Sequence, residues 1–362
     1  MQKTTRRQFV QQMSSIIGGI MLSSPTILFG KTRHAKIAVY APSHCSLPAV
    51  HAFHRNHYKK NGVNVEIVYC KEMPEILKKL CAGEVEFAQL MSPMIFDKHS
   101  GQMKATQTPL AVTQVLGTNG GVLGISTISK VNKIQDLEGK TIGVHSPLMV
   151  HHLIMRLLLE KYGLTKKNIK IKTVPMHLIR QALVNFEIDG FINPEPLPSL
   201  LESQAISKSL LLTRMFWLNH PCCLLTCRQS FFENNQQLVE DITRATTTSC
   251  LMLDNIAMRK SQIEKIYTYK TPFNRIPLEK LLQAFAPRRS DFYPFPFLSA
   301  AYVIVDQMKK AKLLPESIEV KATAREVIKS DFSMRIIKQA ASLVPGTSIP
   351  SSTERDETFK LI

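Results

Sequence analysis

Apolar and polar positions between residues 140 and 198 predict strands and helices in alternation. Short apolar runs, typical of buried strands, are separated by segments whose apolar side chains recur every three or four residues, as on one face of a helix. The expected strands are 140–145, 169–174 and 188–192, and the expected helices are 147–162 and about 178–186. This βαβαβ order is the unit of an open parallel sheet covered by helices, so the predicted fold class is α/β.

The same order of elements occurs roughly 100 residues earlier in the chain. There the expected strands are 36–40, 63–68 and 83–88, and the expected helices are 47–60 and a second one that carries Ile76, Leu77, Leu80 and Cys81. An internal repeat of this kind predicts two similar lobes, each an open sheet with flanking helices. Two such sheets that face each other form a cleft at the carboxyl ends of their strands, where ligands bind.

Two extended segments are expected to cross between the lobes. The first, 114–128, is rich in glycine, and the second is the apolar run 223–228. Two crossings of this kind make a hinge that allows the lobes to close on a ligand. The predicted parts are 35–122 and 223–345 for the first lobe, with a mostly helical segment 256–314 packed on it, 123–222 for the second lobe, and 346–362 for a polar, loose tail.

Composition agrees with a globular protein, but the charge balance is unusual. The chain has 362 residues, 44% hydrophobic and 20% charged, which is ordinary for a folded protein of this length. The net charge of +18 is compatible with nucleic acid, an acidic surface or an anionic ligand. The sequence contains no arginine-rich stripe, zinc-finger spacing or basic run interleaved with aromatics. We therefore expect no nucleic-acid partner and interpret the charge as a general basic bias.

The first 34 residues have the order of an export signal of the twin-arginine type. Arg6 and Arg7 are followed by Phe9 and then by an apolar region, 16–29, that Gly18 and Pro25 interrupt. Such signals are read by a receptor, and this apolar region is short for a membrane span. We expect residues 1–34 to direct the chain through the twin-arginine export machinery to the periplasm, with an uncleaved signal as a route to membrane association.

Seven cysteines show no evident disulfide framework; they are Cys45, Cys70, Cys81, Cys222, Cys223, Cys227 and Cys250. An odd count leaves at least one thiol free or intermolecular. His220 and the run Cys222-Cys223-x-x-x-Cys227 raise the question of a metal. Adjacent cysteines seldom both reach one ion, and the sequence shows no second cluster of ligands. Neither a metal nor a cofactor is therefore expected.

Four motifs in order make the chain resemble the periplasmic solute-binding proteins of ABC importers. They are Gly83–Pro93, His151–Leu159, Asp189–Leu197 and the pair His220-Pro221. The resemblance is to the nitrate, sulfonate and bicarbonate branch, of the NMT1-like kind, and covers roughly 36–315. It implies a two-lobed binding-protein fold of type II, a small solute, a membrane permease as partner, and a monomer.

Three positions depart from the family pattern where a small anion would be held. Gln89 stands where the pattern has a histidine at a strand end, Leu197 replaces an aromatic, and Cys223 replaces a lysine. A small anion needs fixed donors, and a lost cation and histidine weaken that interpretation. The sequence is compatible with two kinds of ligand: an oxyanion such as nitrate or bicarbonate, or a larger, partly aromatic or sulfonated solute.

Seven residues are predicted to contact the ligand; they are Ser46, Gln89, Ser92, Asn119, His151, Glu195 and Cys223. His151 lies near the start of a helix, where free N–H groups favour an anion. Gln89 and Ser92 end a strand, and Ser46 belongs with His44 and Cys45 to the loop after the first strand. Asn119 and Cys223 belong to the crossings. Glu195 belongs to the Pro-Glu-Pro turn, where it can either contact the ligand or brace the cleft wall.

An enzyme on the same fold is the alternative to a non-catalytic binding protein. The resembling family includes thiamine-pyrimidine synthases, which use pyridoxal phosphate and carry a cysteine-rich run that Cys222, Cys223 and Cys227 partly match. The sequence shows no Ser-His-Asp set, phosphate loop or paired carboxylates, and an export signal argues against cytosolic biosynthesis. A binding protein is therefore favoured, and a sensor derived from the binding-protein fold is a further alternative.

The export hypothesis gives a first prediction. Replacing Arg6 and Arg7 together by lysine keeps the charge but removes the arginine pair that the receptor reads. We expect the precursor to accumulate in the cytoplasm, which fractionation and immunoblotting would detect. Lysine at Arg33, outside the signal motif, is the matched control. Unchanged export of the double variant would contradict the hypothesis.

Overall fold

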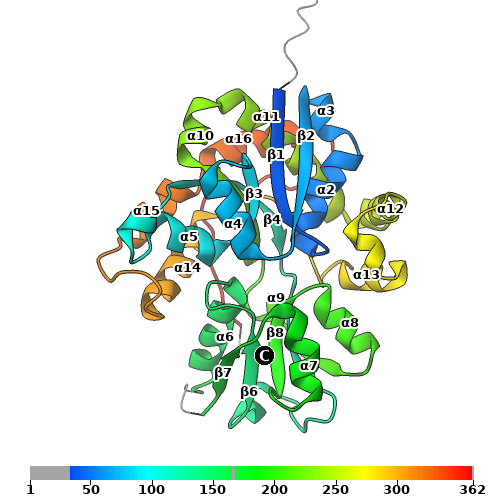
Figure 1. Ribbon diagram of the computed structural model, residues 1–362, viewed down its shortest axis with the longest axis vertical. Coiled ribbons are helices and arrows are strands. Elements are labelled where there is room, and N and C mark those ends of the chain that lie inside the picture. The colour runs from blue at the N-terminus through cyan, green and yellow to red at the C-terminus, as the bar shows by residue number, and fades with distance from the viewer. Residues whose placement is uncertain (1–32, 165–167, 361–362) are drawn as a thin grey trace, which may run out of the picture. The chain divides into compact units, whose positions relative to one another are not determined.

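The computed structural model describes residues 33–164 and 168–360. Arg6, Arg7 and most of the predicted export signal lie outside the described residues. Within the described part of the chain, no helix is both long and apolar enough to cross a membrane. The described residues form two five-stranded sheets with helices on their faces, which confirms the predicted α/β class (Figure 1).

The strands and helices alternate along most of the chain. The strands are β1 (Arg33–Tyr40), β2 (Val63–Cys70), β3 (Phe87–Met91), β4 (Leu110–Thr118), β5 (Gly121–Ser126), β6 (Thr141–Val144), β7 (Lys170–Thr173), β8 (Gly190–Pro194), β9 (Ser207–Leu212) and β10 (Pro221–Arg228). The helices are α2 (Leu47–His54), α3 (His57–Lys60), α4 (Met73–Ala82), α5 (Ser92–Ser100), α6 (Val150–Lys161), α7 (Ile179–Val184), α8 (Leu197–Ser203), α9 (Thr213–Phe216), α10 (Gln229–Asn234), α11 (Gln236–Asp254), α12 (Ile256–Tyr267), α13 (Leu278–Ala284), α14 (Leu298–Lys310), α15 (Val320–Val327) and α16 (Ser330–Ala341).

Both sheets follow one plan. The first has the strand order β2-β1-β3-β10-β4 and the second β7-β6-β8-β5-β9. Three strands of each sheet are parallel, whereas β10 and β5 run antiparallel to both of their neighbours. Each antiparallel strand is the segment that has just crossed from the other sheet. The repeat expected from the sequence is therefore present, and each lobe receives one strand from a crossing.

Burial explains why the central strands are so apolar. All nine residues of β4 are buried, and so are all five of β3. Strands covered by helices on both faces have no polar side to present, so they lack alternation. The long helix α11 covers the first sheet with an apolar stripe that includes Ile242 and Leu253. A smaller core around Ile179 and Phe191 lies under the helices of the second sheet.

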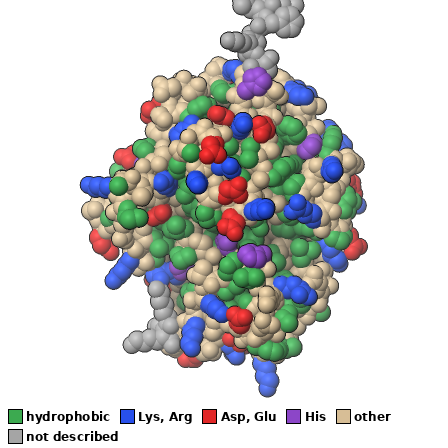
Figure 2. All heavy atoms as spheres, in the orientation of Figure 1, with side chains coloured by type: hydrophobic (Ala, Val, Ile, Leu, Met, Phe, Trp, Pro, Cys, Tyr) green, Lys and Arg blue, Asp and Glu red, His purple; other side chains and the backbone are tan. Residues whose placement is uncertain are grey.

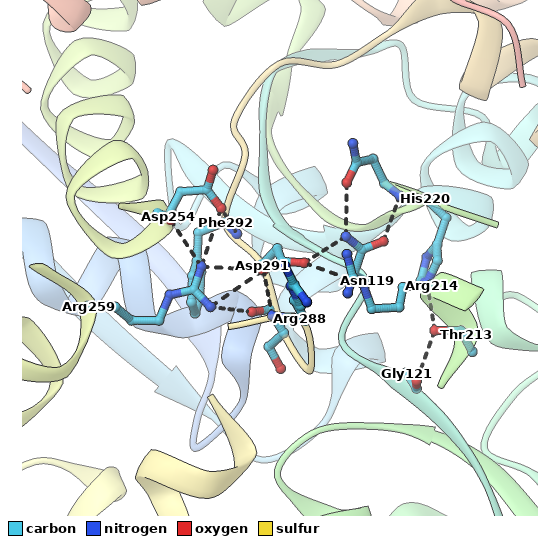
Figure 3. A network of polar contacts seen from close by, with 12 residues as sticks. Asn119, Gly121, Thr213, Arg214, His220, Asp254, Arg259, Arg288, Asp291 and Phe292 are labelled. Carbon is cyan, nitrogen blue, oxygen red and sulfur yellow. Dashed lines mark hydrogen bonds and ion pairs between the residues drawn. The ribbon is translucent and has the colours of Figure 1, made fainter. Parts of the chain in front are cut away.

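The two crossings are fastened directly to each other. Asn119 follows β4 and Asn219 precedes β10, and both have positive φ angles, 61° and 57°, which asparagine tolerates better than most residues. The side-chain N–H of Asn119 donates to Asn219 Oδ1 at 2.9 Å, and Asn219 N–H donates to Asn119 Oδ1 at 2.6 Å (Figure 3). This reciprocal pair fixes the spacing of the crossings.

A buried ion network anchors the crossings to the helical part of the first lobe (Figure 3). Asp291 accepts from the Asn119 side chain at 2.9 Å and pairs with Thr118 through two backbone hydrogen bonds of 2.8 and 3.0 Å. Its other oxygen faces the Arg259 guanidinium at 3.4 Å, and Arg259 is only 2% exposed. Asp254 also pairs with Arg259, so the buried cation is compensated on two sides.

The segment 256–314 contains α12, α13 and α14 but packs differently from the prediction. The expectation that all of it lies on the first lobe alone is wrong, because α13 packs against α8 beside the second sheet and α14 also contacts α6 (Figure 1). Just after α13, Arg289 forms ion pairs with Glu195 and Glu202 of the second lobe. Charge complementarity across the cleft, which periodicity cannot reveal, explains this placement.

The tail predicted to be loose is instead packed over its described part, up to residue 360. Glu357 accepts hydrogen bonds from Trp217 Nε1 at 2.6 Å and from Ser299 Oγ at 2.9 Å. Arg355 lies over the Phe297 ring, 4.5 Å from its centroid, and Phe359 contacts Trp217 with 5.4 Å between ring centroids. The prediction failed because a few residues of a polar segment make well-placed contacts on both lobes.

The excess of positive charge does not gather into one patch on the face drawn in Figure 2. Lysine and arginine side chains are interspersed there with aspartate and glutamate. A nucleic-acid surface would be expected to show a continuous basic stripe. This view is consistent with the general basic bias inferred from the sequence.

The network at the crossings gives a prediction on stability. Replacing Asp291 by alanine leaves the Arg259 guanidinium buried with less compensation, which typically costs about 3–5 kcal/mol. The free energy of unfolding from urea denaturation should fall by that amount. Asp306 pairs with Lys310 on an exposed helix face and is the matched control. Its alanine variant should lose less than about 1 kcal/mol, and equal losses in the two variants would contradict the assigned role.

Candidate functional site

A cavity of about 350 Å³ lies between the facing ends of the two sheets. The first lobe lines it with Tyr40 at the end of β1 and Gln89 in β3, and the second lobe with His145, Met176 and Glu195. The Tyr40 hydroxyl reaches Met176 Sδ at 3.5 Å, so the lobes are in direct contact at its edge. The cavity therefore occupies the place where open α/β sheets bind ligands.

A second, more open depression of about 650 Å³ is less suited to a ligand. It borders the crossings and the C-terminal segment and contains Arg214, Arg288 and Arg355. These cations share it with Asp254 and Asp291, and several of its groups already serve the buried ion network. We therefore take the cavity between the sheets as the candidate site.

Of the seven residues predicted from the sequence, four line the cavity and three do not. Gln89, His151, Glu195 and Cys223 form part of its wall. Ser46 is buried against Ser43, whose hydroxyl bonds to it in a capping pair. Ser92 is buried at the start of α5 without facing the cavity, and Asn119 is occupied by the clamp between the crossings. The cavity is thus built from a subset of the predicted set.

Gln89 joins three segments that meet at the cavity. Its Oε1 accepts from Tyr40 N–H at 3.2 Å, and its Nε2 donates to Ser43 Oγ at 3.2 Å and to Cys223 Sγ at 3.6 Å. The side chain is fully buried, so these bonds satisfy an amide that would otherwise be costly. Gln89 therefore fixes the loop after β1 relative to β10.

His151 is a neutral, unpaired imidazole in the wall. It is 1% exposed, and neither ring nitrogen has a hydrogen-bond partner among the described residues. Burial, with a smaller contribution from His44, lowers the pKa of His151 to about 3. Near neutral pH this side chain offers one donor and one acceptor but no positive charge. It can donate one hydrogen bond to an anion but adds no positive charge to the wall.

Glu195 braces the wall rather than presenting a free carboxylate. One oxygen pairs with Arg289 Nε, and the other accepts from Ser199 N–H at 3.1 Å. Burial raises the pKa of Glu195 to about 7, although Arg289 and Ser199 both act in the opposite direction. Its backbone oxygen also receives His44 N–H at 3.4 Å, so this turn ties the second lobe to the loop after β1.

The glycines of the first crossing make room for two imidazoles. A Cβ atom at Gly120 would lie 2.3 Å from His44 Nε2, and one at Gly121 would lie 2.4 Å from His151 Cδ2. Both distances are far below van der Waals contact. The glycine-rich run, interpreted from the sequence as a hinge, therefore has a steric role at the site.

Three cysteine thiols and His44 gather at the base of the cavity. Cys45 Sγ lies 3.3 Å from His44 Nε2, and the ligand atoms of His44, Cys45 and Cys222 all lie within 4.8 Å of one another. Hydrogen bonds from Cys222, Cys45 and Gln89 hold the pKa of the Cys223 thiol well below its ordinary range, whereas burial raises the pKa of Cys45. His44 and Cys45, which lie on a different segment from Cys222, bring further nitrogen and sulfur atoms to this part of the cavity.

Several lining residues were missed by sequence reasoning although a signal existed. Lys71 and Glu72 follow β2, His145 follows β6 and Met176 follows β7. All are at carboxyl ends of parallel strands, where the rule used for Gln89 would also have placed them. Lys71 is exposed, and among the described residues it is the one lysine or arginine of the lining.

Two sheets of this order, joined by two crossings and enclosing a cavity, define the periplasmic binding-protein fold. The chain belongs to the NMT1-like family, whose model matches residues 30–266. The nitrate/nitrite binding protein NrtA of Nostoc sp. PCC 7120 is 24% identical over 370 residues, which cover 91% of this chain and 82% of the relative.

Solved structures agree on the fold. The periplasmic nitrate-binding protein NrtA of Synechocystis PCC 6803 superposes with a TM-score of 0.77 at 18% identity, covering 91% of this chain and 94% of that one. The periplasmic aliphatic sulphonate binding protein SsuA of Escherichia coli gives a TM-score of 0.65 at 14% identity, covering 81% and 97%. The type II two-lobed fold implied by the motifs is thereby confirmed.

Burial of a neutral imidazole predicts an acid-sensitive stability. The pKa of His151 is about 3 in the folded chain, against an ordinary value of 6.5, so only the unfolded chain gains this proton as the pH falls between those values. Stability is therefore lost over that window, at about 1.4 kcal/mol per pH unit.

Replacing His151 by glutamine should remove this contribution. Between pH 7.5 and pH 4.5, wild type should lose about 2–3 kcal/mol more unfolding free energy than the variant, as measured by urea denaturation at each pH. Glutamine at the exposed His34 is the control and should behave as wild type. Parallel pH profiles of wild type and the His151 variant would contradict the neutral, buried state.

Proposed function

We propose that this chain is the solute-binding component of an ABC importer, which captures a small molecule between its lobes and delivers it to a membrane permease. The observation that carries the proposal is the cavity of about 350 Å³ at the facing carboxyl ends of two equivalent sheets. Membership of the NMT1-like family and relatives named as nitrate and sulphonate binding proteins support it. Twin-arginine export, a periplasmic location and a monomeric state are parts of the same proposal.

The chemistry of the cavity favours an organic solute over nitrate. Its volume is more than ten times the roughly 30 Å³ that one water molecule occupies, so a four-atom anion would leave most of it unfilled. Its walls include Met73, Met91 and Met149, and burial lowers the pKa values of its histidines His44 and His151. We propose a solute with an apolar, partly aromatic body; a sulfonate group, where present, would face Lys71 at the rim.

The binding role is proposed to be non-catalytic. In the described residues, Cys222, Cys223 and Cys227 all belong to the buried strand β10 and do not form a separate cysteine loop. The one buried carboxylate of the lining, Glu195, is engaged with Arg289 and Ser199. These features, together with relatives named as binding proteins, favour solute capture over the synthase-like alternative.

Mass spectrometry of small molecules released from the natively purified protein tests the proposal. The released solute should stabilise the solute-free protein in a saturable way, because a ligand that binds only the folded state raises its stability. Nitrate and bicarbonate, added as probes, should shift the melting temperature little. Conversion of the bound solute into a product would overturn the non-catalytic role, and strong stabilisation by nitrate would overturn the assigned ligand class.

Substitutions in the wall test where that solute binds. Gln89→Ala and His151→Ala should each weaken binding by about 1–3 kcal/mol, the cost of losing a buried polar partner. Calorimetric titration with the identified solute measures the effect. His51→Gln is the control, because His51 is equally buried but bonds Ser249 and Gln262 away from the cavity. Wild-type affinity in both wall variants would contradict the site.

A further inference from the structure

The base of the cavity brings together sulfur and nitrogen donors from two distant segments. His44 and Cys45 follow β1, and Cys222 is the second residue of the return strand β10. The three side chains are at most 2% exposed, and all of them line the cavity. Their donor atoms lie within 4.8 Å of one another, with 3.3 Å between Cys45 Sγ and His44 Nε2.

An irregularity in β10 explains how adjacent cysteines reach the same place. Successive side chains of a regular strand point to opposite faces. The pairing of β10 with β4 shifts register on both sides of Cys223, opposite Gly117. Such bulges re-aim side chains and are frequent near functional sites. Cys222 and Cys223 therefore both face the cavity, which a regular strand would not allow.

Glycines of the facing crossing hold the donors close. A Cβ at Gly117 would lie 2.8 Å from Cys45 Sγ, and a Cβ at Gly120 would lie 2.3 Å from His44 Nε2. Because these two positions carry no side chain, the His44 imidazole and the Cys45 thiol can pack directly against the backbone of the crossing. The second nitrogen of His44, Nδ1, is buried without a partner among the described residues.

The spacing of these donors suits a tetrahedral metal ion. With bonds of about 2.3 Å to sulfur and about 2.0–2.1 Å to nitrogen, sulfur and nitrogen ligands of one zinc ion are about 3.5 Å apart. The observed 3.3 Å between Cys45 Sγ and His44 Nε2 is close to this value, and the other donor pairs of the set lie within 4.8 Å of each other. Two thiolates and one imidazole are also a set that Cu⁺ binds, because soft ligands favour soft ions.

We propose that His44, Cys45 and Cys222 form a binding site for one thiophilic metal ion, Zn²⁺ or Cu⁺, at the base of the cavity. Three protein ligands leave a fourth position, as in open zinc sites. Cys223, which the Gln89 amide holds at 3.6 Å, also lines the cavity. Metal binding at these donors is a property separate from the proposed solute capture.

Metal titration of the full chain, reduced and stripped with a chelator, tests the site. One equivalent of Zn²⁺ or of Cu⁺ should bind in competition with a chromophoric chelator and raise the melting temperature. The two ions are titrated separately, so that the tighter one is identified. Co²⁺, added alone, should give the sulfur-to-cobalt charge-transfer absorption of two thiolates, which reports the ligands without any substitution.

Cysteine variants separate this site from general thiol binding. Loss of a hydrogen-bond partner outside the ligand set typically lowers metal affinity roughly 10–100-fold. Cys45→Ser and Cys222→Ser should each lower the affinity for the metal ion by more than that, because each removes a ligand. Cys227→Ser is the matched control, because Cys227 is a buried thiol of the same strand outside the cluster. It should bind as wild type.

Three results would overturn the proposal. The first is that neither ion competes with the chelator and Co²⁺ gives no thiolate absorption. The second is that binding persists in the Cys45 and Cys222 variants or is lost equally in the Cys227 variant. The third is a native disulfide between Cys45 and Cys222, found by peptide mapping without reduction. Because solute binding is measured separately, failure of the metal site leaves the proposed transport role untouched.

Discussion

The clamp between the two crossings is the constraint on which the rest of this structure depends. The chain passes between its sheets twice, and Asn119 and Asn219 hold the two passages together by reciprocal hydrogen bonds. Asp291 connects this pair to Arg259, a buried cation that would be costly without its carboxylates. Because β5 and β10 begin at these passages, the clamp also sets where each antiparallel strand enters its sheet.

Further contacts tie the lobes together around the cavity. Arg289 reaches across to Glu195 and Glu202, and Tyr40 touches Met176. The C-terminal segment adds a strap, since Glu357 bonds both Trp217 and Ser299. These contacts join the lobes around the cavity, whereas the clamp joins the two crossings.

Desolvation of the lining side chains, more than their charge, determines the chemistry of the cavity. The chain carries a net charge of +18, yet the lining histidines His44 and His151 have lowered pKa values and the lining lysine, Lys71, is exposed. A buried imidazole without a carboxylate partner is more stable neutral than charged. Thiols, thioethers and neutral imidazoles therefore make up much of the cavity wall.

Periodicity alone predicted the repeat and the α/β class, because apolar spacing follows directly from which faces of helices and strands are buried. It misplaced the strand expected at 83–88, which is β3 at Phe87–Met91. Strand ends and helix starts meet at one edge of a sheet, and this rule led to Gln89 and His151, which line the cavity.

Only the tertiary structure decided which polar groups the cavity receives. Asn119 is drawn into the clamp, Glu195 into an ion pair with Arg289, and His44 and Cys45 meet Cys222, which is nearly half the chain length away. These outcomes depend on contacts between segments far apart in sequence and on a bulge in β10. Local spacing does not reveal them, because hydrogen bonds and ion pairs across the fold depend on which side chains the tertiary structure brings together.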